Sequence, residues 1–221
     1  MKEDTLLVHE IYASIQGEST FAGLPCTFVR LVGCNLRCVW CDTPQAFYPT
    51  PGRSERMPRS EVLRRALATK TPLVELTGGE PLLQPGALPL LRELCDAGRT
   101  VLLETSGEAD VSAVDPRVHK IVDLKAPGSG ECHRNRWSNL EHLGPGDELK
   151  FVLADRADYE WMRSTIVERG LTSRGLALLA SCVWDRLAPR DLVEWVLADG
   201  LSVRVQVQLH KVIWGAASEG V

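Results

Sequence analysis

The chain has 221 residues, 44% of them hydrophobic and 24% charged, which is the composition of one globular α/β domain with a buried core. Its formal net charge of −4 argues against a surface built for nucleic acid or membrane. The charged start Met1–Asp4, together with the lack of any long apolar stretch, predicts a soluble, cytoplasmic protein.

The first predicted elements are two strands joined by a turn. Leu6–Tyr12 and Thr27–Val32 are rich in apolar, β-branched and aromatic residues, as strands are. Between them, Gly17 and its polar neighbours indicate a turn, and composition alone favours a turn on the surface. Arg30 interrupts the second strand, so its charge must either face solvent or pair with an anion in a pocket.

The next loop holds three of the seven cysteines, Cys34, Cys38 and Cys41, in the spacing C-x3-C-x2-C. An odd number of cysteines and no sign of secretion favour a reducing compartment, where such close spacing indicates metal before disulfide. A structural zinc site would need a fourth ligand from a second close pair, and the sequence has none. Three thiolates suit a 4Fe–4S cubane with one iron open to a substrate or cofactor. The cysteines follow the carboxyl end of a strand, where α/β barrels carry their active sites.

Beyond this loop, strands and amphipathic helices alternate. The hydrophobic pattern predicts helices over residues 60–69, 86–97, 158–169 and 190–199. It predicts strands over residues 73–76, 100–104, 121–124, 149–153, 176–179 and 203–209. The alternation indicates βαβ units in a mostly parallel sheet, and about six core strands are too few for a closed eight-stranded barrel. We therefore expect a truncated, open α/β barrel.

A second motif, Thr-Gly-Gly-Glu-Pro at 77–81, follows the strand at 73–76. Two consecutive glycines let a ligand approach the backbone closely, although alone they would indicate only a turn before a helix. With the cysteine triad and the aromatic Trp40 before its last cysteine, this motif resembles the radical S-adenosylmethionine (radical SAM) superfamily. The resemblance implies that S-adenosylmethionine chelates the open iron and that one electron splits it into methionine and a 5′-deoxyadenosyl radical.

Further segments narrow the resemblance to the 7-carboxy-7-deazaguanine synthase family. They cover nearly the whole chain, at residues 10–19, Gly23, 28–31, 41–43, 104–107, 122–125 and 208–211. Members are homodimeric truncated barrels that convert 6-carboxy-5,6,7,8-tetrahydropterin to 7-carboxy-7-deazaguanine, contracting a pyrazine ring to a pyrrole and releasing ammonia. The resemblance thus implies a radical SAM carbon–nitrogen lyase of queuosine and 7-deazapurine biosynthesis. It also implies Mg2+ and a reductase such as flavodoxin or ferredoxin.

The family pattern implies one radical SAM core domain over 1–221, with an N-terminal strand and substrate loop at 6–32 and a cluster loop at 33–58. Its metal ligands are Cys34, Cys38 and Cys41 for the 4Fe–4S cluster and Thr43 for Mg2+. The residues expected to hold S-adenosylmethionine are Trp40, Asp42, Gly79, Ser106, Asp123 and Lys125. The residues expected to hold the pterin are Ile15, Gln16, Gly17, Arg30 and Thr77. No side chain is expected to be the catalyst, because the radical acts on the substrate.

Elementary chemistry agrees with three of these roles. The guanidinium of Arg30 offers a fork for a carboxylate, and the amide of Gln16 can address the donor–acceptor edge of a pterin. A lone hydroxyl such as that of Thr43 can hold Mg2+ only if the substrate and waters complete its octahedron.

The sequence departs from the family in two places. Ser106 stands where many members have asparagine, which shortens the reach to the ribose, and residues 180–183 show no clear match to the family's late nucleoside contact. Asp123 and Lys125 could instead form an exposed ion pair. His210 is compatible with a place facing the substrate or with packing near the terminus.

Two other functions share part of the pattern. A glycyl-radical-enzyme activase has the cysteine triad and a similar size, but it would not need the Gln-Gly-Glu element, Arg30 or Thr43. A non-catalytic iron–sulfur electron carrier has cysteine ligands too, but it would not cleave S-adenosylmethionine on reduction.

Overall fold

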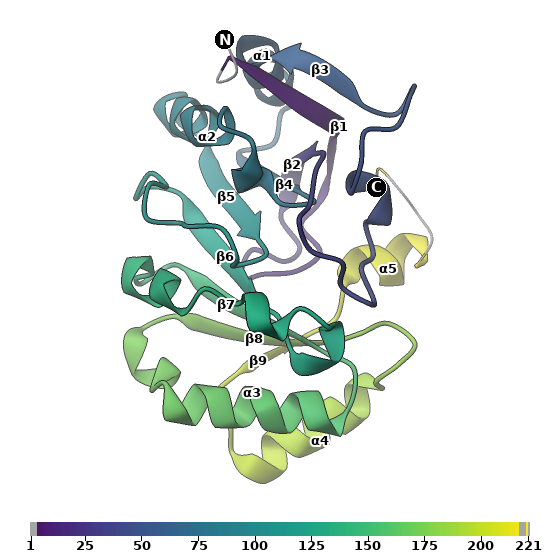
Figure 1. Ribbon diagram of the computed structural model, residues 1–221, viewed down its shortest axis with the longest axis vertical. Helices are drawn as coiled ribbons and strands as arrows, with labels where there is room; N and C mark the ends of the chain where they lie inside the picture. The colour runs from purple at the N-terminus through teal and green to yellow at the C-terminus, as the bar shows by residue number, and fades with distance from the viewer. Residues whose placement is uncertain (1–3, 217–219, 221) are drawn as a thin grey trace.

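The computed structural model describes residues 4–216 and 220, which form one nine-stranded sheet flanked by helices (Figure 1). The strand order is β3-β1-β2-β4-β5-β6-β7-β8-β9. β1 (Thr5–Ile15) and β3 (Glu55–Pro58) form an antiparallel edge next to β2 (Pro25–Leu31). The following strands all run parallel to β2: β4 (Leu73–Gly78), β5 (Thr100–Thr105), β6 (His119–Leu124), β7 (Glu148–Leu153), β8 (Ala177–Cys182) and β9 (Arg204–Gln206).

Helices cover the outer face of this curved sheet in two groups. α1 (Arg59–Leu67) and α2 (Ala87–Asp96) pack on the N-terminal strands, and α3 (Arg156–Glu168) and α4 (Pro189–Asp199) on β7 and β8 (Figure 1). Each group buries its own hydrophobic core between helices and sheet. Because side chains alternate along a strand, every second residue faces the opposite, concave side.

Local sequence signals set the ends of the helices. Asp155 is the N-cap of α3, where its carboxylate accepts a 3.0 Å hydrogen bond from the backbone N–H of Asp158. Pro189 occupies the first turn of α4, and Gly200 ends that helix in the left-handed conformation at φ 58°. Both helices are thereby positioned to return the chain to the next parallel strand.

A small apolar cluster closes the amino-terminal end of the concave side. It is formed by Cys26, Phe28, Leu73, Leu102 and Ile121, which come from β2, β4, β5 and β6. Phe21, in the turn between β1 and β2, packs against it and contacts His119 edge to face at 5.0 Å. The interior is therefore apolar at this end and becomes polar toward the carboxyl ends of the strands.

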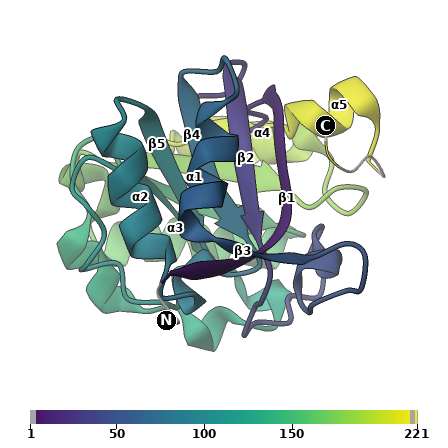
Figure 2. The same cartoon turned by 90° about the horizontal axis from the view of Figure 1, so that it is seen from above.

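The sheet does not close into a barrel, and the gap between β1 and β9 is sealed by side chain and helix instead of by strand pairing. The amide of Gln206 accepts from Ser19 N at 3.0 Å and donates to Ser19 O at 2.6 Å, as a neighbouring strand would. The short helix α5 (Leu209–Trp214) then lies beside the end of β1, where Leu209 N donates to Gly17 O at 3.0 Å (Figure 2).

The predicted open, mostly parallel α/β barrel is confirmed, and each predicted helix and strand has a counterpart. Two details of the prediction are wrong. The cluster loop expected over residues 33–58 is not a loop to its end, because its last four residues form β3, which pairs with β1. The strand expected over 203–209 ends at Gln206, and Leu209 begins α5. Among the described residues, no helix is long and apolar enough to cross a membrane.

Candidate active site

The concave side of the sheet encloses a cavity of about 680 Å3, within the range of small-molecule sites. It is bounded by the loop 33–43, the carboxyl ends of the strands, the turn after β1 and α5. The cavity is lined by every residue to which the sequence assigns a role: Ile15, Gln16, Gly17, Arg30, Cys34, Cys38, Trp40, Cys41, Asp42, Thr43, Thr77, Gly79, Ser106, Asp123 and Lys125. The fold thus gathers residues that lie as far as 110 positions apart, since 125 − 15 = 110.

The three cysteines lie on a loop that is fastened at both ends. Gly33 N donates to Ala46 O at 2.8 Å, and Val39 N donates to Ser129 O at 3.0 Å. Burial raises the pKa of each thiol, to about 11 for Cys38, and the positive charge of Lys125 acts in the opposite direction. A metal that binds these sulfurs must therefore displace their protons.

The donor set fits an iron–sulfur cubane better than a single metal ion. Within residues 4–216 and 220, no three His, Cys, Asp or Glu side chains converge closely enough to hold one ion. In a cubane each cysteine binds a different iron, so the three sulfurs need to surround a space and not a point. Three half-buried thiols that line the cavity, without converging on one point, meet that requirement.

The glycine pair after β4 brings two backbones together. A Cβ atom at Gly78 or Gly79 would collide with Leu31 or with the carbonyl of Gly33. The space allows Gly79 N to donate to Leu31 O at 3.2 Å and Glu80 N to donate to Gly33 O at 2.7 Å. The pair is therefore needed to dock the cluster loop on β4, in addition to any contact with a ligand.

Glu80 is completely buried and ties β4 to the end of β5. Its carboxylate accepts hydrogen bonds from Leu82 N at 3.0 Å, Thr105 Oγ1 at 2.8 Å, Ser106 N at 2.8 Å and Ser106 Oγ at 2.6 Å. The hydroxyl of Ser106, expected to contact the nucleoside, is thus engaged with Glu80. This role of Glu80 was not predicted from the sequence.

Asp123 and Lys125 lie two residues apart at the carboxyl end of β6. Their side chains form a 2.8 Å ion pair and are only 13% and 17% exposed. The alternative of an exposed surface pair is therefore wrong, since both groups line the cavity. Asn135 accepts from Lys125 N at 2.8 Å and donates to Lys125 O at 2.9 Å, which fixes the backbone of this segment.

Arg30 faces the cavity and not the solvent. Its Nε donates to Glu10 Oε1 at 2.8 Å, and its Nη2 donates to the Tyr12 hydroxyl at 3.1 Å. Two of its five N–H groups are used in this way, so the others remain for a ligand. Tyr12 and Phe28 stack at 5.2 Å and form an aromatic wall beside the guanidinium.

The turn after β1 sends Gln16 into the cavity. Its Nε2 donates to the carboxyl group of Glu75, and its Oε1 accepts from Glu18 N at 2.9 Å. Burial, together with the negative charge of Glu104, raises the pKa of Glu75 well above its ordinary value. Gly17 packs against His210, where a Cβ would lie 2.5 Å from the ring Nδ1. The prediction of a surface turn from composition alone is therefore wrong.

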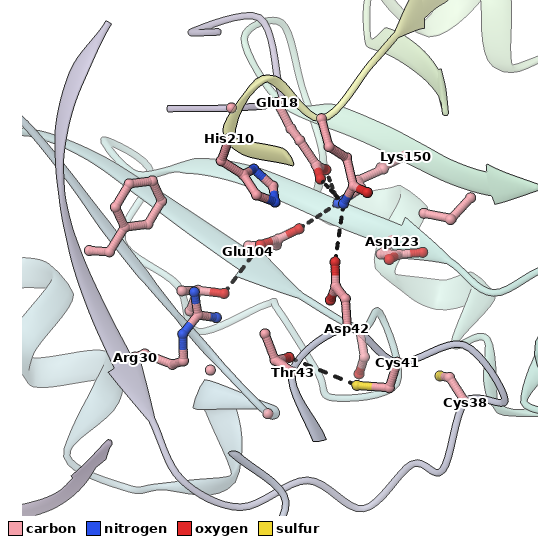
Figure 3. Close-up of a pocket in the computed structure, with 18 of the residues that line it drawn as sticks. Glu18, Arg30, Cys38, Cys41, Asp42, Thr43, Glu104, Asp123, Lys150 and His210 are labelled. Atoms are coloured by element: carbon pink, nitrogen blue, oxygen red, sulfur yellow. Dashed lines mark hydrogen bonds and ion pairs between the residues drawn. The ribbon is translucent and has the colours of Figure 1, made fainter. Parts of the chain in front are cut away.

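A cluster of charged side chains, formed by Lys150, Glu104 and Glu18, lines the cavity between Arg30 and the turn after β1 (Figure 3). Lys150 of β7 forms ion pairs with Glu104 of β5, at 2.7 Å, and with Glu18 of the turn. Thr77 donates to Glu104 at 3.2 Å, so a residue expected near the pterin is joined to the cluster. The sequence analysis assigned no role to Glu18, Glu104 or Lys150.

The C-terminal segment reaches back to the cluster loop. Asp42 accepts from Gln208 Nε2 and Lys211 Nζ, both at 3.1 Å. Thr43 precedes the short 3-10 helix 44–46, and its hydroxyl lies 3.8 Å from Cys41 Sγ (Figure 3). Of residues 180–183, which show no clear match to the family's late nucleoside contact, Cys182 and Val183 line the cavity. Just beyond them Trp184 and Arg186 line it too, and the guanidinium of Arg186 lies 5.7 Å from the centre of the Trp40 ring.

Comparison with known proteins places this geometry among radical SAM proteins. Residues 28–125 match the family model of the Radical SAM superfamily. The chain is 47% identical to the 7-carboxy-7-deazaguanine synthase of Chlorobaculum tepidum over 99% of both chains. It is 44% identical to that of Koribacter versatilis over 97% of this chain and 99% of the other. The crystal structure of QueE from Escherichia coli has a similar fold, with a TM-score of 0.74, 22% identity and coverage of 92% and 94%.

Proposed function

Because the chain belongs to the 7-carboxy-7-deazaguanine synthase family of radical SAM enzymes, we propose that the cavity inside its sheet is the site of the ring contraction. The reaction converts 6-carboxy-5,6,7,8-tetrahydropterin to 7-carboxy-7-deazaguanine with release of ammonia. One observation carries the proposal: a single cavity is lined both by the cysteine triad and by a set of polar groups suited to a charged pterin.

The residues of the cluster loop and of the neighbouring strand ends would hold the cofactors. Cys34, Cys38 and Cys41 would ligate a 4Fe–4S cluster, and the buried pair of Asp123 and Lys125 offers both an acceptor and a cation for S-adenosylmethionine. When bound, cluster and S-adenosylmethionine supply the radical chemistry that removes a hydrogen atom from the substrate. Trp40, Asp42, Gly79 and Ser106 complete the proposed cofactor set.

The residues at the end of β1, in the turn after it, and in β2 and β4 would hold the pterin. Arg30 keeps N–H groups beyond those bound to Glu10 and Tyr12, and it is the cation placed to receive the substrate carboxylate. Burial opposes the charge of Arg30, but Tyr12 and Glu10 favour it and raise its pKa, so the guanidinium stays charged. The side chains of Ile15, Gln16 and Thr77 and the backbone of Gly17 would contact the ring.

Thr43 is the proposed protein ligand of Mg2+. Its hydroxyl points to the cluster-loop side of the cavity, near Cys41. One neutral oxygen cannot hold Mg2+, which prefers six oxygens in an octahedron, so the ion would bind only with substrate and water. Its charge would then orient the substrate carboxylate beside Arg30.

Three features beyond the site also belong to this proposal. We expect one radical SAM domain over the whole chain, located in the cytoplasm. We expect a homodimer, supported by the exposed apolar side chains of Val207, Val212 and Ile213 on and before α5. A reductase such as flavodoxin or ferredoxin would reach the cluster loop, where Val39 and Tyr48 are exposed.

The test is a reaction with purified, anaerobically reconstituted protein. It contains S-adenosylmethionine, dithionite, Mg2+ and 6-carboxytetrahydropterin, and products are followed by mass spectrometry. The proposal predicts 7-carboxy-7-deazaguanine and ammonia in equal amounts. Cleavage of S-adenosylmethionine with the pterin unchanged would favour an activase, and no cleavage at all would favour an electron carrier.

A further inference from the structure

In the charge cluster, Lys150 joins strand β5 to the turn after β1, because its ammonium pairs with one carboxylate from each. It extends inward from β7 with its side chain 8% exposed. Its ammonium lies between Glu104 of β5, at 2.7 Å, and Glu18 of the turn after β1 (Figure 3). An ammonium has three N–H donors, and two of them are accounted for by these carboxylates.

A comparison of two glutamates that line the cavity shows what Lys150 does. Glu75 and Glu104 face the same cavity from adjacent strands, and loss of solvent by itself would raise the pKa of both carboxyl groups. For Glu104 the Lys150 ammonium outweighs burial, so its pKa lies below the ordinary value of glutamate. Glu75 pairs with the neutral Gln16, and its pKa stays well above that value. The two carboxyl groups therefore differ in pKa because Glu104 forms an ion pair with Lys150 and Glu75 does not.

The two carboxylates are also fixed in space by this contact. Glu104 accepts from Thr77 Oγ1 at 3.2 Å, and Glu18 accepts from Gln208 Nε2 at 2.6 Å. Each of these partners comes from a different part of the chain, and Lys150 joins the two pairs. Removing its charge would leave two neighbouring carboxylates that repel one another, and the pKa of Glu104 would rise because it loses its cation.

The chemistry of the proposed substrate explains why ionised, fixed carboxylates are useful here. A tetrahydropterin presents several N–H donors, on its amino group and on its ring nitrogens. A carboxylate only accepts hydrogen bonds, whereas a protonated carboxyl turns one oxygen into a donor and loses part of that match. Hydrogen bonds to a charged acceptor are also stronger than those between neutral groups.

We propose that Lys150 is a positioning residue that holds Glu18 and Glu104 in place as hydrogen-bond acceptors for the N–H groups of the substrate. The inference rests on the function proposed above, because it needs a ligand rich in N–H donors. Lys150 acts through the two carboxylates and does not itself bind the pterin.

The test measures binding of 6-carboxytetrahydropterin to reconstituted enzyme with S-adenosylmethionine and Mg2+ but without reductant, so that no turnover occurs. Lys150→Met should weaken binding by about 10- to 100-fold, the range of one or two charge-assisted hydrogen bonds. The loss should be greater at low pH, because Glu104 then protonates at a higher pH than in the wild type. The iron content, which depends on cysteines far from β7 in the chain, should not change.

The pH dependence of pterin binding is set by all the charged groups around Glu104 and Lys150. The charged groups that act on Glu104, or on its partner Lys150 and their neighbours, are Arg30, Glu75, Asp42, Glu18, Asp123, Lys125, His210 and Lys211. All of them remain in Lys150→Met, so a shift of the pH profile between wild type and variant reports the removed ammonium.

Lys120→Met is the matched control. Lys120 lies on β6, is 6% exposed and forms a 3.0 Å ion pair with Asp147, but its side chain is outside the cavity. It should lower stability while leaving pterin binding and its pH profile unchanged. An equal loss of binding in Lys120→Met would mean that stability, and not position, is responsible.

A second set of variants keeps the inference testable if Lys150→Met does not fold. In Glu18→Gln/Glu104→Gln, both carboxylates that form ion pairs with Lys150 are gone, so adding Lys150→Met should cause no further loss of binding. A further loss would show that Lys150 binds the pterin directly and would overturn the positioning role. Wild-type binding in a folded Lys150→Met would overturn it too. If the wild-type enzyme neither binds nor converts the pterin, the proposed function itself is wrong.

Discussion

Replacement of Glu80 by alanine should destabilise the fold more than any change at an exposed glutamate. Glu80 is fully buried and accepts four hydrogen bonds, two from hydroxyl groups and two from the backbone N–H groups of Leu82 and Ser106. The hydroxyls can rotate toward other acceptors, but the two N–H groups cannot. Each orphaned N–H costs about 1–3 kcal/mol, so the free energy of unfolding should fall by about 2–6 kcal/mol.

Glu80→Gln gives an intermediate case. It keeps the shape of the side chain, but an NH2 group replaces one oxygen and must face at least one donor. The expected loss is about 1–3 kcal/mol, the cost of one unpaired buried group. Glu194→Ala, at an exposed position of α4, is the control and should stay within about 0.5 kcal/mol of the wild type.

The assay is urea unfolding followed by circular dichroism, with and without the cluster. The order of stability should be wild type and Glu194→Ala, then Glu80→Gln, then Glu80→Ala. If Glu80→Ala unfolds at the wild-type midpoint, the four hydrogen bonds do not stabilise the junction of β4 and β5. If it is stable but fails to bind S-adenosylmethionine, Glu80 serves the ligand and not the fold.

Three changes test the ligand assignments. Cys38→Ala should lose the cluster and all turnover, whereas Cys95→Ala should retain about four iron per chain; full iron in the first variant would contradict the assignment. Arg30→Ala should raise the KM for the pterin by the equivalent of about 2–5 kcal/mol while cleavage of S-adenosylmethionine alone persists; unfolding with unchanged affinity would make Arg30 structural. Thr43→Ala should keep its iron but lower turnover and weaken the magnesium dependence; full turnover with an undiminished magnesium requirement would remove Thr43 from the site.

The sequence predicted the parts of the fold that depend on local pattern. Strand and helix periodicity located β4 to β8 and α1 to α4, and the cysteine spacing located the cluster loop. It missed β3 and α5, because both are short and are held by partners far along the chain. β3 pairs with β1 about 50 residues away, since Glu55 pairs with Val8 and 55 − 8 = 47. A six-residue helix such as α5 is too short to be stable alone.

The charge cluster could have been predicted by an argument that was applied only to Arg30. A charged residue inside an apolar strand must find a partner or a pocket. Glu75, Glu104 and Lys150 each interrupt an apolar strand in the same way. The partners of Glu80 were beyond that argument, because Thr105 and Ser106 lie 25 and 26 residues further on and meet it only in the folded sheet.

The turn after β1 shows why composition alone misjudged this site. A Gln-Gly-Glu turn is polar and small, yet each of its residues is fixed by a distant element. Gln16 is held by Glu75 of β4, and Glu18 is held by Lys150 of β7. Gly17 has no side chain, which leaves room for His210 and lets its carbonyl accept from Leu209 N at 3.0 Å. Gly17 is therefore required for the close contact with α5, and the side chains of Gln16 and Glu18 on either side of it line the cavity. A sheet too short to close can therefore still enclose a cavity, because this turn and α5 fill the gap that missing strands would occupy.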